Sequence, residues 1–400
     1  MRIPRYRPDL ASVLFSAGFR PFFLGAAIWA AIGIPLWLLL YDKGVVLPSL
    51  LPPLIWHIHE MIFGFGAAAV AGFLLTAIPN WTGRMPLQGW PLTILFALWV
   101  LGRIGILLSA WIGARAAAVA DLSFPLAFLS LVAREIVGGR SWSNLPMVGA
   151  VSLLLVGNLL VHLDVLHIAD TANVGNRVGV ATLLILITLV GGRIIPSFTR
   201  RSLLKNRAAV ALPPPEGRFD RAVLGLTMLA LFAWLVNPAA LWTAWCTVIA
   251  GGANGLRMSR WQGHQVARNP LLFVLHVGYG WLAIGLALLG LSRLLDLLPA
   301  TAALHLLTVG AIGTMTLAVM TRASLGHTDR PLVAGWRTQV IYVLVTLATV
   351  LRVLSPLTGA QMLHVLWASG ALWSAAFGLF AIFYGRVLTQ PCVAAGARPI

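Results

Sequence analysis

Trp56-His57-Ile58-His59-Glu60-Met61 opens a long apolar segment that continues to about residue 78. Two imidazoles, a carboxylate and a thioether therefore lie within about one and a half turns of a helix. Ionisable side chains are costly in hydrocarbon and usually serve a function there. Neutral imidazole is also the commonest protein ligand for metal ions and haem iron. The stretch predicts a membrane helix with a cofactor site in it.

The rest of the chain has the same apolar character. Of its 400 residues, 59% are hydrophobic and 10% are charged. No soluble domain buries so much apolar surface, so lipid is the expected solvent. We predict an all-α, polytopic membrane bundle of about 12 transmembrane helices, forming a single integral-membrane domain over residues 1–400. The expected spans are 15–41, 56–78, 91–111, 114–134, 144–163, 177–198, 220–236, 239–256, 269–294, 301–321, 336–355 and 360–384.

The net charge of +17 orients the chain in the membrane. With the amino terminus inside, Arg103 and Arg193 lie within spans, and most other basic residues fall on the inner side. This bias predicts a multi-pass protein of the bacterial inner membrane with both termini in the cytoplasm. It also explains the basicity without a nucleic-acid partner. The few basic residues of the outer side are Lys43, Arg115, Arg177, Arg293 and Arg352.

Several motifs are missing, and one loop stands out. Cys246 lies in a span and Cys392 in the inner tail, so no disulfide is expected. The sequence lacks CxxC, CxxCH and Walker motifs, which argues against a zinc ribbon, c-type haem or an ATPase. The only real linker, at about 200–218, contains a run of three prolines and reads as an inner loop.

A weak repeat connects spans that are four apart. The second span ends with Ile78-Pro79-Asn80-Trp81-Thr82-Gly83-Arg84, and the sixth with Ile195-Pro196-Ser197-Phe198-Thr199-Arg200-Arg201. Met320-Thr321-Arg322 is a looser echo at the end of the tenth. The pattern suggests three tandem four-helix modules. The alternative is that proline and basic residues simply end many helices on the inner side.

Most histidines of the spans gather at one depth. Four or five imidazoles lie near outer helix ends, where a bundle could bring them around a cofactor. Interhelical hydrogen bonds are the alternative explanation. His276 lies about two turns from the inner face, so one haem cannot join it to the outer group, and we expect it to form an interhelical hydrogen bond. The outer group is His57, His59, His162, His305 and His364.

Charged residues accompany these histidines. His57 and His59 point about 200° apart on an ideal helix, so they face different neighbours. Glu60 could orient His57 through a hydrogen bond without binding the cofactor itself, relay protons, or neutralise the charge of a metal ion. Arg103 and Asp121 share a depth on consecutive spans and are expected to form a buried ion pair. Arg20 is expected to extend to the inner interface.

The sequence resembles the NnrS family of bacterial membrane proteins over nearly its whole length. The first and tenth spans carry the most specific motifs. The matching stretches are Gly18-Phe19-Arg20-Pro21-Phe22-Phe23, Trp56 to Gly64, Ala71 to Ala77 with Asn80-Trp81-Thr82-Gly83, Gly192 to Thr199, Leu275-His276-Val277-Gly278-Tyr279, His305 to Thr316, and Met320-Thr321-Arg322 with Gly326-His327-Thr328.

The resemblance implies a 12-helix protein that contains haem and copper and takes part in denitrification or in tolerance of nitrosative stress. It carries over the motif histidines His57, His59, His276, His305 and His327, without assigning each to iron or copper. Haem–copper oxidases, by analogy only, place haem ligands on their second and tenth helices. The sixth span here has no histidine or cysteine, which leaves an oxidase-like copper site there in doubt.

On these grounds we expect a haem protein that binds nitric oxide or a related small gas, and that reduces it if an electron donor supplies the electrons. The cofactors expected are haem b and copper. His305 is the expected axial ligand, with His59 or His57 opposite and Arg103 near the propionates; His276 could serve a second site with His327. The alternatives are a secondary transporter, or an assembly partner of a membrane complex with structural histidines.

Overall fold

The computed structural model describes residues 12–205, 210–295 and 298–392. Within these ranges the chain is helical and has no strand, which confirms the all-α prediction. Residues 206–209 of the predicted linker lie outside the described residues, and so do Arg2, Arg5, Arg7, Arg207 and Arg398. The linker is shorter than predicted, because the helix before it continues to Lys205.

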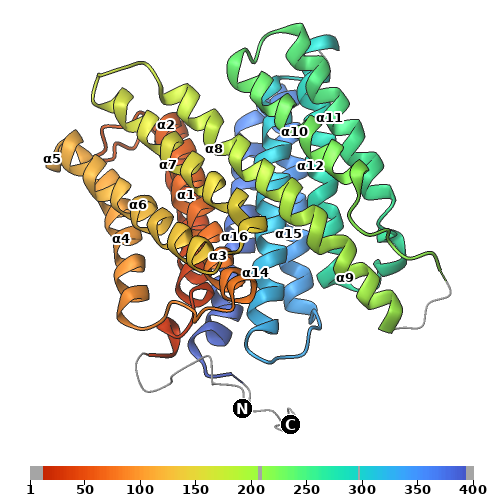
Figure 1. Ribbon diagram of the computed structural model, residues 1–400. Helices are drawn as coiled ribbons and strands as arrows, with labels where there is room; N and C mark the ends of the chain where they lie inside the picture. Colours follow the sequence, from red (N-terminus) through yellow and green to blue (C-terminus); the bar gives the residue numbers. More distant parts are fainter. Residues whose placement is uncertain (1–11, 206–209, 296–297, 393–400) are drawn as a thin grey trace. The chain divides into compact units, whose positions relative to one another are not determined.

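Among the described residues, eleven helical stretches are long and apolar enough to cross a membrane, which confirms a polytopic helical bundle. The predicted span 239–256 forms a helix of 19 residues, α11, which is not one of the eleven. Figure 1 shows the helices, which are α1 (Phe19–Lys43), α2 (Pro53–His59), α3 (Ala67–Thr82), α4 (Trp90–Leu107), α5 (Ser109–Ile112), α6 (Ala114–Gly138), α7 (Leu145–Val165), α8 (Ala172–Leu186), α9 (Gly192–Lys205), α10 (Arg218–Val236), α11 (Leu241–Ser259), α12 (Pro270–Leu295), α13 (Ala300–His305), α14 (Thr314–Gly326), α15 (Trp336–Leu354) and α16 (Met362–Thr389).

Three of the spans contain a π-helix. These wider turns are Glu60–Gly66 between α2 and α3, Ile187–Gly191 between α8 and α9, and Leu306–Gly313 between α13 and α14. They fall in the second, sixth and tenth predicted spans, the spacing of the sequence repeat. π-helices are rare and often occur at functional sites. The arrangement of three modules stays a prediction.

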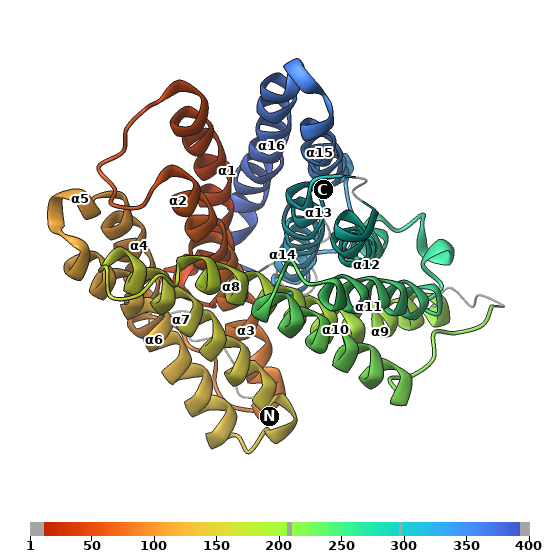
Figure 2. The same cartoon turned by 90° about the horizontal axis from the view of Figure 1, so that it is seen from above.

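The chain divides into two compact units, which are described separately. Among the described residues, unit 1 comprises 12–179, 322–331 and 377–392, and unit 2 comprises the rest. In unit 1, α1 packs on α3, α4 packs on α6, and α6 packs on α7. Figure 2, seen from above, shows α4, α6 and α7 side by side. Helix α4 can approach α6 closely because Gly102 and Gly105 face it, with no room for a Cβ atom.

The first and last helices of unit 1 are joined by a buried arginine. Arg20, only 2% exposed, donates from Nη1 to the carbonyl oxygens of Leu388 at 2.7 Å and Gln390 at 2.8 Å. These carbonyls end α16, where a helix leaves acceptors without internal partners and carries partial negative charge. The expectation that Arg20 extends to the membrane interface is therefore wrong.

Unit 2 has its own buried ion pair. Helices α10, α11 and α12 lie side by side, as both views show. Arg257 of α11 donates from Nε to Asp220 Oδ1 of α10 at 2.9 Å, and from Nη1 to the carbonyl of Thr188 at 3.0 Å. Thr188 belongs to the π-helix Ile187–Gly191, so the arginine ties that turn to the helix pair. The hydroxyl of Tyr279 accepts a further bond from Arg257 and donates to Asn254.

Candidate metal centre

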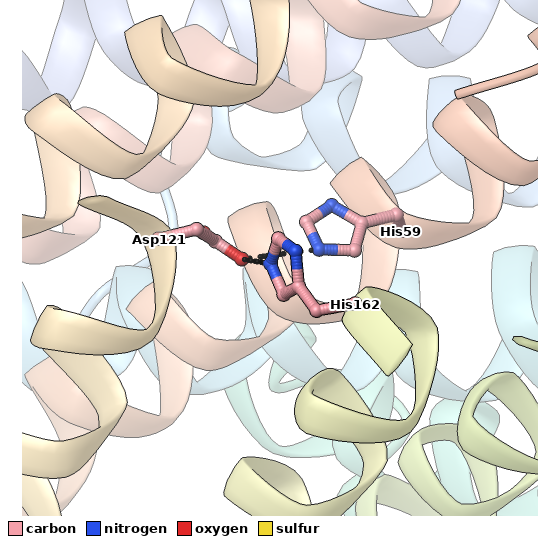
Figure 3. Close-up of side chains that lie close together, drawn as sticks. All are labelled: His59, Asp121 and His162. Carbon is pink, nitrogen blue, oxygen red and sulfur yellow. Dashed lines mark hydrogen bonds and ion pairs between the residues drawn. The ribbon is translucent and has the colours of Figure 1, made fainter. Parts of the chain in front are cut away.

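Three helices of unit 1 bring His59, Asp121 and His162 together. His59 is the last residue of α2, Asp121 lies two turns into α6, and His162 is in the last turn of α7. Figure 3 shows the three side chains pointing toward one another. His59 is 0% exposed, Asp121 1% and His162 2%, so the group is closed off from solvent and lipid.

The spacing of the nearest atoms suits a metal ion. Oδ2 of Asp121 lies 3.2 Å from Nε2 of His59 and 3.0 Å from Nε2 of His162. All three ligand atoms lie within 4.8 Å of one another. In a tetrahedral site with bonds of about 2.0–2.1 Å, neighbouring ligand atoms are about 3.3 Å apart. The two separations from the carboxylate oxygen to the imidazole nitrogens are therefore close to those that a bound ion requires.

A second layer of polar groups holds this triad in place. Glu60 Oε1 accepts from Nδ1 of His59 at 3.0 Å and from Nη1 of Arg103 at 2.6 Å. Arg103 also pairs through Nη2 with Oδ1 of Asp121, which leaves Oδ2 to face the imidazoles. The amide of Asn158 donates to that Oδ2 at 2.8 Å. The ion pair of Arg103 with Asp121 confirms the sequence prediction.

The hydrogen-bond acceptors and charges around His59 can accommodate one more positive charge. Both ring nitrogens of His59 face oxygen acceptors, since Nε2 lies 2.9 Å from Oδ1 of Asn158. The ring can satisfy them all only as an imidazolium, or with a cation in place of the Nε2 proton. Glu60 and Asp121 together carry two negative charges against the single positive charge of Arg103. A bound cation would therefore compensate the charge that the carboxylates leave over.

The local sequence explains why these residues meet. Asn158 and His162 are four residues apart, so they lie on one face of α7. The close approach of α7 to the following helix occurs at Gly157 and Gly175, where an added Cβ would meet the facing backbone oxygen. The π-helix that begins at Glu60 opens its carbonyl ladder, and Trp99 of α4 donates to the carbonyl of Gly64 at 3.0 Å. The wider turn thus fixes how α2 faces α4.

His57 faces another neighbour, as its helical position predicts. It is half-buried, and its ring stacks on Trp37 of α1 with centroids 4.2 Å apart. The sequence offers Glu60 as a partner of His57, whereas in the structure this carboxylate orients His59. Glu60 directly follows His59 in the sequence and begins the π-helix, and from this position its carboxylate reaches the ring of His59. His57 faces Trp37 instead.

His305 and His364 belong to unit 2. His305 ends α13, and its Nδ1 donates to the carbonyl of Thr301 at 2.6 Å. A metal-ligating histidine commonly uses its second nitrogen in this way. His364 is exposed near the start of α16. Pairing His305 with His59 or His57 would join residues of different units, and that pairing stays a prediction.

His276 forms the interhelical hydrogen bond that we expected. Its Nδ1 donates to the carbonyl of Leu272 at 3.1 Å, and the hydroxyl of Thr199 on α9 donates to its Nε2 at 3.4 Å. Both nitrogens thus have partners within unit 2. His327 belongs to unit 1, where its exposed ring lies 5.7 Å from that of Phe19. Joint ligation by His276 and His327 stays a prediction.

Sequence reasoning missed the candidate ligand combination of His59, Asp121 and His162. It placed His162 at the same depth as His59 but did not include it among the ligands, and it treated Asp121 only as a partner of Arg103. Asn158 was not considered. The signal was present, because an aspartate between spans bearing two histidines at one depth is a candidate ligand set. What the sequence lacks is the rotation of each helix about its axis.

Comparison with known proteins agrees with this description. Among curated proteins, none matches the chain. The family model of the NnrS protein matches residues 13–391, which include both units' spans and all three residues of the triad. That family is generally metal-associated, and membership suggests a role linked to nitric oxide. With nearly its whole length covered, the chain belongs to the NnrS family.

Proposed function

We propose that the protein is a nitric-oxide-binding membrane metalloprotein that uses a transition-metal ion at His59, Asp121 and His162 and a haem b on His305. The observation that carries the proposal is the fully buried triad with its separations of 3.0 and 3.2 Å. Family membership supports the link to nitric oxide. In this role the protein would serve the metabolism of the gas or tolerance of it.

The donor set narrows the choice of ion. Imidazole suits zinc, copper, iron and nickel, and two histidines with one carboxylate leave coordination positions open. Copper and ferrous iron are the candidates that also react with nitric oxide. The residues fit such an ion, because Glu60 orients His59 and Arg103 orients Asp121, as outer partners of metal ligands do.

The fit of a haem rests on His305. The bond from its Nδ1 to the carbonyl of Thr301 fixes the ring and directs Nε2 away from its own helix. The π-helix that follows contains Gly310 and Gly313, against which Trp281 and Trp373 pack. The ring nitrogens of His59 already serve the triad, so we do not assign His59 to the haem. Arg103 is likewise engaged by Glu60 and Asp121, so a role with propionates is not favoured.

The bound cofactors would supply an open coordination position for nitric oxide. The chain's own residues do the rest. Asp121 and the two imidazoles set the geometry of the ion, and the buried surroundings exclude bulk water. Arg103 pairs with both Glu60 and Asp121 and so holds the two carboxylates in position.

The metal site is tested by stoichiometry. Purified protein is stripped with a chelator, reloaded with Co²⁺ or Cu²⁺, and its metal content measured. We expect His162→Ala to lose the ion while His264→Ala, which changes an exposed histidine of a loop, keeps it. Equal metal content in the two variants, with retained visible absorption of bound Co²⁺ in His162→Ala, contradicts the assignment.

The haem is tested separately by absorption spectra of oxidised and reduced protein. His305→Ala should remove haem absorbance, and nitric oxide should shift the spectrum of the parent protein but not that of His305→Ala. His264→Ala serves again as the control. A parent protein from haem-replete cells that lacks a Soret band, or a His305→Ala variant with an unshifted spectrum, counts against haem on His305.

A further inference from the structure

A cleft of unit 1 lies between the first residues of α6 and the last residues of α7. Its cavity volume is about 570 Å³, and it is open to the surroundings. It is lined by Leu50 and Pro52 before α2, by the start of α6, and by the end of α7 with His167. The mechanism proposed above does not use this cleft.

The walls of the cleft continue directly into the metal triad. The segments before α2, at the start of α6 and at the end of α7 lead to the three helices that carry His59, Asp121 and His162. Asp121 lies five residues beyond Ala116 of the wall, or about 7.5 Å at 1.5 Å per residue. His162 lies only two residues before Asp164, about 3 Å along the helix axis. The cleft thus opens close to the triad along the elements that carry its residues.

Two metal-binding side chains stand at this opening. His167 is exposed, and its backbone has the left-handed φ of 56°, which turns the chain sharply after α7. Asp164 is half-buried, and its Oδ2 accepts from the amides of Thr171 and Ala172 at 3.0 Å each, which holds the carboxylate in place. Arg115 at the start of α6 also lines the cleft. An imidazole and a fixed carboxylate are ligands that divalent transition metals accept.

We propose that this cleft is the entrance through which the metal ion reaches the triad, with His167 as its first ligand. The ion passes from the exposed imidazole along the Asp164 end of α7 to His162, and then to the closed site beside Asp121. The proposal rests on the metal site proposed above. It assigns metal delivery to the side of the membrane that α6 starts from, which the charge distribution predicts to be the outer side.

The first test blocks the cleft. Ala116 lines it and is exposed, so Ala116→Cys can be modified with a bulky thiol reagent in the purified full-length protein. The matched control is Met85→Cys, an exposed position in a separate cleft of about 110 Å³ near Glu135. Uptake of Co²⁺ is followed by visible absorption and final metal content. We expect modification to slow uptake severely in Ala116→Cys and to leave Met85→Cys and the modified parent unchanged.

The second test removes the first ligand. His167→Ala should slow Co²⁺ uptake several-fold and leave the final stoichiometry unchanged, because the triad itself is intact. Removing His264, also exposed in a loop, should change neither quantity.

The outcomes separate the two proposals. If the parent protein binds no Co²⁺ at the triad, both the proposed metal site and the proposed entrance are wrong. If the parent binds Co²⁺ but uptake is equally fast with the cleft blocked and with His167 replaced, the entrance is wrong and the metal site stands. Slowing by modification at residue 85 as large as that at 116 also contradicts the entrance.

Discussion

At the residue scale, Arg103 is the side chain on which the buried carboxylates depend. It is 4% exposed and contacts both Glu60 and Asp121, which lie on different elements. A buried charge that loses its partner is strongly destabilising, because water does not replace that partner. The same guanidinium therefore supports both the packing of unit 1 and the proposed metal site.

We expect Arg103→Met to destabilise the protein by about 3–5 kcal/mol, the usual effect of breaking a buried pair. The measurement is the apparent unfolding midpoint in detergent, followed by circular dichroism. Arg193→Met is the matched control, because that side chain is 40% exposed and its ion pair with Glu216 is longer, with Nε 3.5 Å from Oε2. Similar midpoints for the two variants would show that Arg103 is not needed for stability.

Glu60 should act on the metal without touching it. Its carboxylate holds Nδ1 of His59 and would fix the direction of Nε2. Replacement by glutamine keeps the shape and removes the charge, so we expect Glu60→Gln to weaken metal affinity by about 10–100-fold. Glu135→Gln, at a more exposed ion pair with Arg84, should leave affinity unchanged. A titration with Co²⁺ that gives one affinity for both variants contradicts the role of Glu60.

The residues also mark how far sequence alone can reach. The ion pair of Arg103 with Asp121 follows from shared depth, and the hydrogen bond of His276 follows from isolation at another depth. The triad does not follow, because depth says nothing of helix rotation. Arg20 was misplaced for a related reason: its acceptors are carbonyls at the end of α16, which no side-chain pattern reveals.

At the element scale, each π-helical span contains a glycine pressed by a large side chain. A Cβ atom added to any of these glycines would collide with that side chain. The pairs are Gly64 with Arg103, Gly192 with Arg257, and Gly313 with Trp373. These contacts occur in the second, sixth and tenth predicted spans. The sequence repeat was read from the inner ends of the spans, whereas the structure adds the recurring π-helix in their interior. Propensity does not predict π-helices, since the extra residue per turn is stabilised by its neighbours.

Gly64 should tolerate no side chain. An added Cβ would lie 2.8 Å from Nη1 of Arg103 and 2.9 Å from both Oε2 of Glu60 and Nε1 of Trp29. Overpacking of this kind costs about 1–3 kcal/mol. We expect Gly64→Ala to lower the unfolding midpoint and the metal content together.

The control is Gly252→Ala in α11, where an added Cβ meets nothing within 4 Å. This variant should be neutral or slightly stabilising, because alanine has the higher helix propensity. Gly64→Ala behaving like Gly252→Ala in both measurements would contradict the packing argument.

At the scale of the whole molecule, the apolar spans could be predicted because lipid allows few alternatives. Among the described residues, eleven of the twelve expected spans are long and apolar enough to cross a membrane. The exception is α11, whose 19 residues include Gly251, Gly252, Gly255 and Arg257 and are less apolar than the other spans. The division into two units could not be predicted. Unit 1 takes 322–331 and 377–392 from the far end of the chain, and such long-range packing leaves no local pattern.

Orientation in the membrane is the prediction that belongs to this scale. The positive-inside rule places the start of α6 outside and the loop around Arg84 inside. In intact cells or spheroplasts, a membrane-impermeant thiol reagent should label Ala116→Cys and not Met85→Cys. Labelling of both should occur once the membrane is made permeable. The reverse pattern of labelling would invert the topology and place the metal entrance on the cytoplasmic side.

The bond from Arg20 to the end of α16 has a consequence for biosynthesis. Leu388, which accepts from Arg20, follows it by 368 residues. At about 5–20 residues per second, a ribosome needs roughly 20–70 seconds to cover that distance. Throughout this time the first helix holds a guanidinium without its final acceptors. A nascent chain that stops short of these last carbonyls thus keeps an uncompensated charge, a mark by which quality-control proteases could tell truncated products from finished ones.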